Sequence, residues 1–255
     1  MEIYKKMHDY MESYDKSNPK IKIKIQHTYS VVAKAQEISK SLSLNKEDTN
    51  LAIIIALLHD IGRFEQLKRY NSFIDHLTID HASLGIQILF EEHLIEHFLD
   101  TREYDSMIYY AIANHNRLKI EPGLDKRTLL HCKIIRDADK LDNLEIKCKQ
   151  DFEDVYGVTK EQVSTQTISK KVYDALNEHR QINARDRVTD LDVWLTHIGF
   201  VYDFNFAYSL KETLENNYAS IILHQIACKD KQTVQQIEEI DKVVNQYMKE
   251  QLYEK

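Results

Sequence analysis

Residues 51–58 form an uninterrupted apolar run, LAIIIALL, that leads directly into His59 and Asp60. The run is too short to cross a bilayer, so it indicates a helix at the centre of a protein core. Burying an imidazole or a carboxylate without a polar partner is costly, because such groups lose their hydration. The chain must therefore pair His59 and Asp60 with neighbours at a helix end, or use them to hold a metal ion.

The scarcity of turn-forming residues supports a helical fold for the whole chain. Its 255 residues include only 5 glycines and 2 prolines, and these residues are needed for tight hairpin turns. Leucine, lysine and glutamate are plentiful, and they favour long helices. We predict an all-α protein that is large enough for one large domain or for a core with an appended subdomain.

The first two predicted helices each carry candidate site residues. Apolar residues in 27–42 recur with the spacing of an amphipathic helix, and His27 falls in its first turn. The next helix follows Asn45, a typical N-cap residue, and ends before Gly62, which stands where a glycine commonly follows a helix. This helix contains the apolar run, so the His-Asp pair is expected in its last turn.

Three further helices are predicted to bring polar groups to the core. One begins at His81 after an aspartate N-cap, and the next carries His115 near its end on the core-facing side. A Pro-Gly break then precedes a long helix on which Asp139 and Asp142 share the apolar stripe. Asp137 lies on roughly the opposite side of that helix.

The C-terminal third is predicted to add at least three helices to the bundle. One is the aromatic segment 194–210, and the last begins near Thr233. The sequence predicts a weakly marked boundary between the two regions at residues 151–159. We therefore expect one domain over residues 1–150 and a helical extension over residues 151–255, packed on the same core.

Charge and composition exclude several classes of protein. The net charge is −7 and no block of Lys and Arg stands out, which argues against duplex nucleic acid as the main partner. No signal peptide or membrane span is evident, and the three cysteines, Cys132, Cys148 and Cys228, fit no CxxC spacing. We expect a cytoplasmic protein with free thiols and no membrane partner; the sequence leaves its oligomeric state open.

Six polar groups at helix ends or on core-facing stripes form one candidate site: His27, His59, Asp60, His81, His115 and Asp139. Neutral imidazole and carboxylate are ligands that suit zinc, iron, manganese or nickel. Four histidines and two aspartates exceed the needs of one tetrahedral site, and they fit two metals that share a carboxylate. A single core histidine is more often hydrogen-bonded than metal-bound, so the prediction depends on the whole series.

This ordered series, with ALLHDIG at the double position and DADKLDN at the last, resembles the HD-domain metal-dependent phosphohydrolase superfamily. The resemblance covers roughly residues 25–145 and implies an all-α HD-domain helical bundle, to which the C-terminal helices are added. His81 and His115 match the two additional histidines of binuclear members, which the related ppGpp hydrolases lack. The chain has no GYP signature of the cyclic di-GMP phosphodiesterases.

The resemblance also implies a role for each matched residue. The first metal would be held by four residues: His27, His59, Asp60 and Asp139. Asp60 would bridge to a second metal held by His81 and His115, and a metal-bridging hydroxide would be the nucleophile. Arg63 and Lys140 are predicted to clamp the substrate phosphate, although a surface salt bridge is an equal alternative for each. Asn143 could orient a ligand.

The leading interpretation is a metal-dependent phosphohydrolase, a phosphomonoesterase or phosphodiesterase, that acts on a small phosphorylated substrate such as a nucleotide. It would use two divalent transition metals per chain, drawn from iron, manganese, nickel or zinc. The main alternative is a di-iron oxygenase of the HD type, which has a similar ligand set. A non-catalytic HD module that senses a ligand is a third interpretation, and the intact ligand set argues against it.

Overall fold

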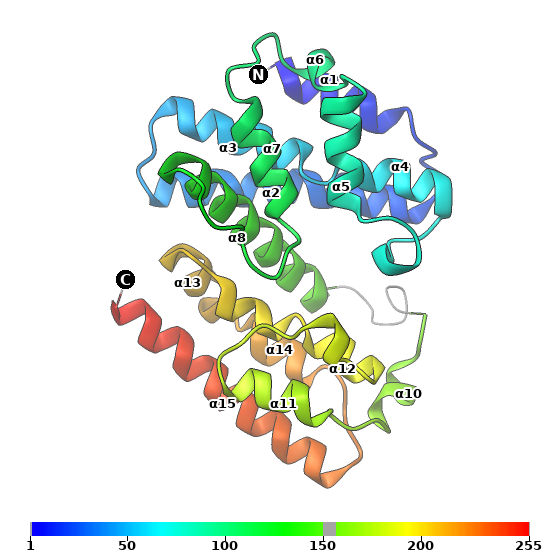
Figure 1. Cartoon of the computed structure of the whole chain (residues 1–255). Helices are drawn as coiled ribbons and strands as arrows, with labels where there is room; N and C mark the ends of the chain where they lie inside the picture. Colours follow the sequence, from blue (N-terminus) through cyan, green and yellow to red (C-terminus); the bar gives the residue numbers. More distant parts are fainter. Residues whose placement is uncertain (1, 150–156, 255) are drawn as a thin grey trace. The chain divides into compact units, whose positions relative to one another are not determined.

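The structure is a computed structural model that describes residues 2–149 and 157–254, and every regular element in this part of the chain is helical (Figure 1). The all-α prediction is therefore confirmed. The chain divides into two compact units, Met1–Asp139 and Lys140–Lys255, so the division falls inside the long helix α8 (Lys126–Lys149). The predicted division at 150/151 lies outside the described residues and stays a prediction.

The first unit surrounds the apolar helix that the sequence predicts. Its helices are α1 (Glu2–Glu12), α2 (Pro19–Ser41), α3 (Lys46–Leu58), α4 (Ile61–Tyr70), α5 (His81–Ile86), α6 (Ile95–Phe98), α7 (Asp105–Asn114) and the first part of α8, with a 3-10 turn η1 (Asp75–Leu77) and a π-helical turn η2 (Gln87–Glu91). Helix α3 packs against α1, α2 and α7. Ile55, Leu57 and Leu58 are buried almost completely, as expected for a central core helix.

The junction between α3 and α4 differs from the prediction. Helix α3 ends at Leu58, so His59 and Asp60 form the connection between two helices and do not lie in a last turn. Gly62 was predicted to follow a helix end, and this is wrong because it lies inside α4. A Cβ atom on Gly62 would stand 2.2 Å from the carbonyl oxygen of His81. Glycine is needed here because α4 and α5 approach each other closely.

Helix α2 begins earlier than the sequence analysis predicted. Asn18 caps it, because its side chain accepts a hydrogen bond from the backbone N–H of Lys20, and Pro19 occupies the first turn. His27 therefore lies in the third turn of the helix. Residues 20–26 alternate between isoleucine and lysine or glutamine, which is the pattern of a strand. This alternation explains why periodicity did not predict helix before residue 27.

The other helix boundaries in the first unit that concern the site agree with the predictions. Asp80 caps α5 by accepting a hydrogen bond from the backbone N–H of Ser83 at 2.8 Å, and His81 is the first helical residue. His115 directly follows the last residue of α7, and α8 begins three residues after Gly123. These ends place both histidines where their side chains can reach a neighbouring helix.

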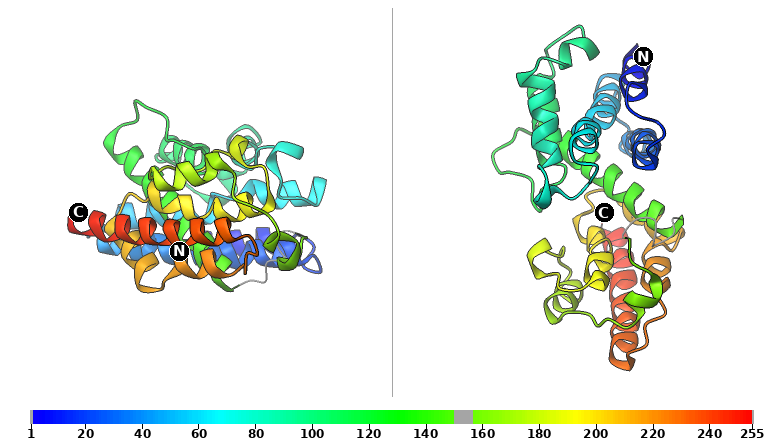
Figure 2. Two further views of the ribbon diagram at one scale, coloured as in Figure 1. Left: turned by 90° about the horizontal axis from the view of Figure 1, so that it is seen from below. Right: turned by 90° about the vertical axis from the view of Figure 1, so that its right-hand side faces the viewer.

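The second unit has a core of its own around Trp194. Its helical segments are α10 (Lys160–Ser164), α11 (Lys170–Asn177), η3 (Ala184–Asp186), α12 (Asp190–Leu195), η4 (Ile198–Asp203), α13 (Ala207–Glu215), α14 (Tyr218–His224) and α15 (Lys231–Glu254), after the end of α8. Helix α15, red in Figure 2, packs against α11, α13 and α14. The indole N–H of Trp194 donates to the carbonyl oxygen of Ile222 at 2.9 Å, so the buried ring keeps its polar contact.

The prediction of one aromatic helix over 194–210 is wrong. The segment is divided into the end of α12, the 3-10 helix η4 and the start of α13, and the backbone is extended at Phe204 and Phe206. The side chain of Asn205 donates to the carbonyl oxygen of Asp203 at 2.9 Å. Such local side-chain bonds compete with helical ones, and they explain the break.

Across the described residues, none of the helices combines the length and the apolar content that crossing a bilayer requires. The three cysteines, Cys132, Cys148 and Cys228, form no disulfide bond, as the sequence analysis predicted.

Candidate metal centre

The six residues predicted to hold metal converge within the first unit. They come from α2, the α3–α4 junction, α5, the end of α7 and α8, and they are His27, His59, Asp60, His81, His115 and Asp139. Five of them are buried, and the side chain of Asp139 is 18% exposed. The tertiary structure thus brings together groups that are up to 112 residues apart in the chain.

The carboxylate of Asp60 lies between two pairs of histidines. Its Oδ2 atom is 3.4 Å from Nε2 of His27 and 3.5 Å from Nε2 of His59. Its Oδ1 atom is 3.3 Å from Nε2 of His81 and 3.7 Å from Nε2 of His115. Each carboxylate oxygen therefore faces a different pair of imidazoles, which is the arrangement that a bridging ligand requires.

Asp139 completes the first group of donors. Its Oδ1 atom lies 3.2 Å from Nε2 of His27 and 3.9 Å from Nε2 of His59. In the second group, the Nε2 atoms of His81 and His115 are 3.0 Å apart. Two ligand atoms that each lie about 2.0–2.2 Å from one ion are separated by roughly 3.0–3.5 Å, and most of these distances fall in that range.

The second nitrogen of three of the histidines is already engaged. Nδ1 of His59 and Nδ1 of His115 donate to backbone carbonyl oxygens three residues earlier, at 2.8 and 2.7 Å. Nδ1 of His81 donates to Oδ2 of Asp75 at 2.7 Å. Because these acceptors cannot donate, each Nδ1 holds the proton and each Nε2 lone pair faces the cluster. Nε2 of His59 is buried without a hydrogen-bond partner in the described structure, as expected for a metal ligand.

The protonation states also suit a metal site. Burial lowers the pKa of His59 to about 4 and also lowers the pKa of His81, so both imidazoles are neutral at pH 7. Burial by itself would raise the pKa of Asp60 and of Asp139. The charge of Lys24 near Asp60 and the His27 imidazole 3.2 Å from Asp139 outweigh that effect, so the pKa of both carboxyl groups is lowered and both are ionised. Neutral imidazole and carboxylate are the forms that bind metal.

Lys24 belongs to this site, and the sequence analysis missed it. Its Nζ atom lies 2.5 Å from Oδ2 of Asp60 and 5.6 Å from the ring centroid of Phe73. Lys24 precedes His27 by three residues on α2, so the two side chains share one face of the helix. The i, i+3 spacing of Lys24 and His27 could have revealed this role. It does so only if the helix begins before Lys24, whereas the predicted helix begins at residue 27.

Arg63 and Lys140, the two residues predicted to clamp the substrate phosphate, each form an ion pair with an aspartate. Nη1 of Arg63 donates to Oδ1 of Asp75 at 2.6 Å. Lys140 belongs to the second unit, where its Nζ atom lies 2.7 Å from Oδ2 of Asp203. Asp203, for which the sequence offered no role, is thereby explained as the partner of a buried lysine. The catalytic roles of Arg63 and Lys140 stay predictions.

Of the neighbouring carboxylates on α8, Asp139 is the one that joins a donor group. Asp137 and Asp142 are buried, but among the described residues neither lies within a set of metal-ligand atoms. The role of Asn143 as an orienting residue also stays a prediction. Asp75, Asp80 and His81 form a third set of possible metal-ligand atoms. This set shares His81 with the six-residue cluster.

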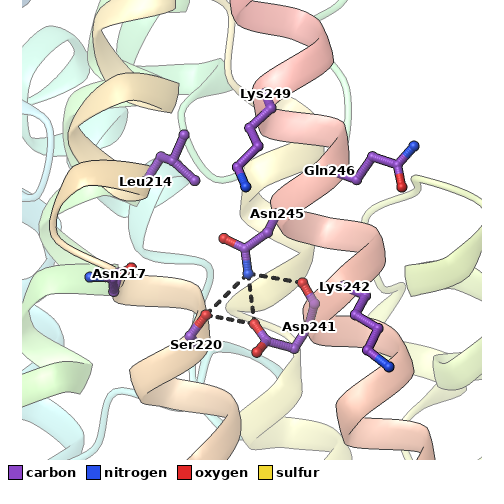
Figure 3. A pocket seen from close by; sticks show the side chains of 8 residues that line it. All are labelled: Leu214, Asn217, Ser220, Asp241, Lys242, Asn245, Gln246 and Lys249. Atoms are coloured by element: carbon purple, nitrogen blue, oxygen red, sulfur yellow. Dashed lines mark hydrogen bonds between the residues drawn. The ribbon is translucent and has the colours of Figure 1, made fainter.

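A polar groove of about 720 Å³ lies in the second unit between α13, α14 and α15 (Figure 3). Its centre is a closed network in which Ser220 and Asn245 donate to Oδ1 of Asp241 at 2.6 and 2.7 Å. His224 lies 3.2 Å from the other oxygen of Asp241. These groups satisfy one another, and the metal-donor groups of the described residues all lie in the first unit.

Comparison with known families agrees with this geometry. Residues 25–144 match the family model of the HD domain. The match covers just under half of the chain and shows that this part of it contains an HD domain, a family that generally contains metal-dependent phosphohydrolases. The match spans the whole cluster from His27 to Asp139, so the His and Asp groups that could bind a divalent metal lie within the HD domain. No curated protein and no solved structure matches the chain significantly.

Proposed function

We propose that the protein is a phosphohydrolase that uses two divalent metal ions and acts on a small phosphorylated substrate, such as a nucleotide. The proposal rests mainly on Asp60, whose two oxygens face two different histidine pairs at 3.3–3.7 Å. A carboxylate in this position can serve two ions at once, whereas a site for a single ion would leave one histidine pair without a purpose.

The proposed ligands divide into two sets that share Asp60. The first set is His27, His59, Asp60 and Asp139, and the second is Asp60, His81 and His115. When bound, two such cations lower the pKa of a water molecule and neutralise the charge that develops on a phosphoryl group. Imidazole and carboxylate ligands suit iron, manganese, nickel and zinc.

Positive side chains next to the cluster favour an anionic substrate. The ammonium group of Lys24 contacts Asp60, and Nε of Arg63 lies 3.9 Å from the other oxygen of the same carboxylate. The side chains of both cations are 15% exposed, so they are poorly screened by water yet accessible to a ligand. Fixed positive charge at this position would orient a phosphoryl group and oppose its repulsion by the two aspartates.

The test is to purify the protein anaerobically, measure its metal content, and then screen nucleotides and sugar phosphates for release of inorganic phosphate. We expect about two metals per chain and a phosphatase activity that a chelator abolishes and added metal restores. Asp139→Asn should lose both properties. Asp125→Asn should keep them, because Asp125 is exposed and lies outside the cluster, where it accepts from the backbone N–H of Thr128 at the start of α8.

Other outcomes would favour the other classes of HD-domain protein. Iron together with oxygen consumption and no phosphate release would replace the proposal with a di-iron oxygenase. Tight binding of a phosphorylated ligand without turnover would indicate a sensing module. Absence of bound metal under all these conditions would remove the basis of the proposal.

A further inference from the structure

Asp75 links the proposed second metal position to the segment that precedes α5. It lies in the 3-10 turn η1, and its Oδ2 atom accepts a hydrogen bond from Nδ1 of His81 at 2.7 Å. Its Oδ1 atom accepts from Nη1 of Arg63 at 2.6 Å and from Nε2 of Gln66 at 3.0 Å. Both oxygens of the carboxylate are therefore occupied by donors from within the fold.

Gln66 anchors this arrangement from the inside. Its side chain is fully buried, and its Nε2 atom also lies 2.8 Å from Oγ1 of Thr78 and 2.9 Å from the carbonyl oxygen of Ile79. Its Oε1 atom accepts from Nη1 of Arg63 at 2.8 Å. Arg63 and Gln66 are one turn apart on α4, so the helix that follows the His-Asp pair holds the turn that carries Asp75.

His81 depends on this network in a way that its neighbours do not. Nδ1 of His59 and Nδ1 of His115 donate to backbone carbonyl oxygens three residues earlier, in the helices that these two residues directly follow. His81 instead relies on a side chain from a separate segment.

We infer that Asp75 is a positioning residue that fixes the tautomer and ring orientation of His81, and thereby sets the affinity of the second metal position. The inference rests on the proposed two-metal function. It also gives Arg63 a second task beside the predicted one, since its Nη1 group donates to Asp75 and Gln66. Loss of such a partner typically lowers metal affinity by about 10–100-fold, because the ligand becomes less basic and less well oriented.

The experiment is a titration of the metal-free full-length protein with Co²⁺, followed by calorimetry and by visible absorption. The wild type should bind two equivalents. In Asp75→Ala the second equivalent should bind about 10–100-fold more weakly while the first is unchanged, and Asp75→Asn should show a smaller shift in the same direction. Asp125→Asn is the matched control and should bind both equivalents like the wild type.

Two results would overturn the inference. Either both Asp75 variants bind the two equivalents as tightly as the wild type, or they weaken both equivalents by the same factor, as a general loss of structure would. Thermal melts of the metal-free proteins show whether Asp75→Ala is folded, and if it is not, the isosteric Asp75→Asn decides. Failure of the wild type to bind a second equivalent would instead refute the two-metal function itself.

Discussion

Gly62 lies directly against the backbone of His81. A Cβ atom on Gly62 would stand 2.2 Å from the carbonyl oxygen of His81 and 2.6 Å from the backbone nitrogen of Gly85. These are contacts with backbone atoms, which cannot rotate away. The absence of a side chain at Gly62 therefore lets the start of α5 approach the α3–α4 junction, and this approach brings His81 to within 3.3 Å of Asp60.

Gly62→Ala should destabilise the protein, by about 1–3 kcal/mol or more, because the added methyl group forces α4 and α5 apart. The free energy of unfolding from urea denaturation measures this effect. Gly85→Ala is the control in the same interface, since its Cβ would lie no closer than 3.5 Å to the facing atoms of Ile61 and Gly62. It should be neutral or slightly stabilising. Equal effects of the two changes would show that the close approach is unimportant.

Asp60→Ala should remove metal binding and turnover together. The proposed bridging carboxylate serves both sites, so metal content should fall from about two per chain to near zero. The thermal stability of the variant should fall less than its metal content and turnover. Lys24 would lose its ion-pair partner, but its side chain is 15% exposed and can be hydrated. Elemental analysis and a thermal melt measure the two effects, and substantial activity of this variant at saturating metal would show that Asp60 is not a bridge.

His115→Ala distinguishes a site with two metals from a site with one. With two metals, stoichiometry should fall from about two per chain toward one while the first set of ligands stays complete, and turnover should drop steeply. If His115 is only a hydrogen-bonded core residue, the variant should instead lose about 1–3 kcal/mol of stability with its metal content unchanged. Elemental analysis beside a thermal melt separates these outcomes.

Lys24→Met should lower turnover by about 100-fold while metal content stays near two per chain, because the lysine supplies charge for the substrate and does not bind metal. Steady-state kinetics and elemental analysis provide the measurements. Lys22→Met, at an exposed position on the same helix, is the control and should behave like the wild type. Loss of metal in Lys24→Met would mean that the lysine acts by holding Asp60 in place.

His197 should make the stability of the second unit depend on pH. Burial and the charge of Lys147 lower the pKa of its imidazole to about 3, whereas an unfolded histidine has a pKa near 6.5. Protonation thus favours the unfolded chain, so its contribution is fully present above about pH 6.5 and is lost as the pH falls toward 3. The free energy of unfolding can change by at most about 1.4 kcal/mol per pH unit for one such group. The change should be smaller here, because the side chain of His197 is only half-buried.

Urea denaturation at a series of pH values between about 7 and 5 tests this dependence. His197→Phe should show a shallower fall in unfolding free energy than the wild type, because the variant has no imidazole to protonate. His76→Gln, a change at an exposed histidine, serves as the control. Parallel curves for the wild type and His197→Phe would contradict the prediction.

Local patterns in the sequence were sufficient for the helical class and for the set of candidate ligands. Helix ends depend on interactions within a few residues, so neighbouring side chains predict them. Examples are the N-caps Asn45 and Asp80 and the helix end before His115. The apolar run 51–58 likewise indicated a central helix, because such a segment is stable only in a core. The order of the His and Asp residues indicated an HD domain, which the family match to residues 25–144 confirms.

Contacts between distant segments were decided only by the tertiary structure. Neither the pairing of Lys24 with Asp60 nor that of Asp75 with His81 and Arg63 follows from spacing, because hydrogen bonds and ion pairs between elements depend on how those elements pack. The need for glycine at position 62 was misjudged for the same reason: the atom that excludes a side chain belongs to residue 81. Periodicity describes one helix at a time, and it carries no record of the neighbour against which that helix packs.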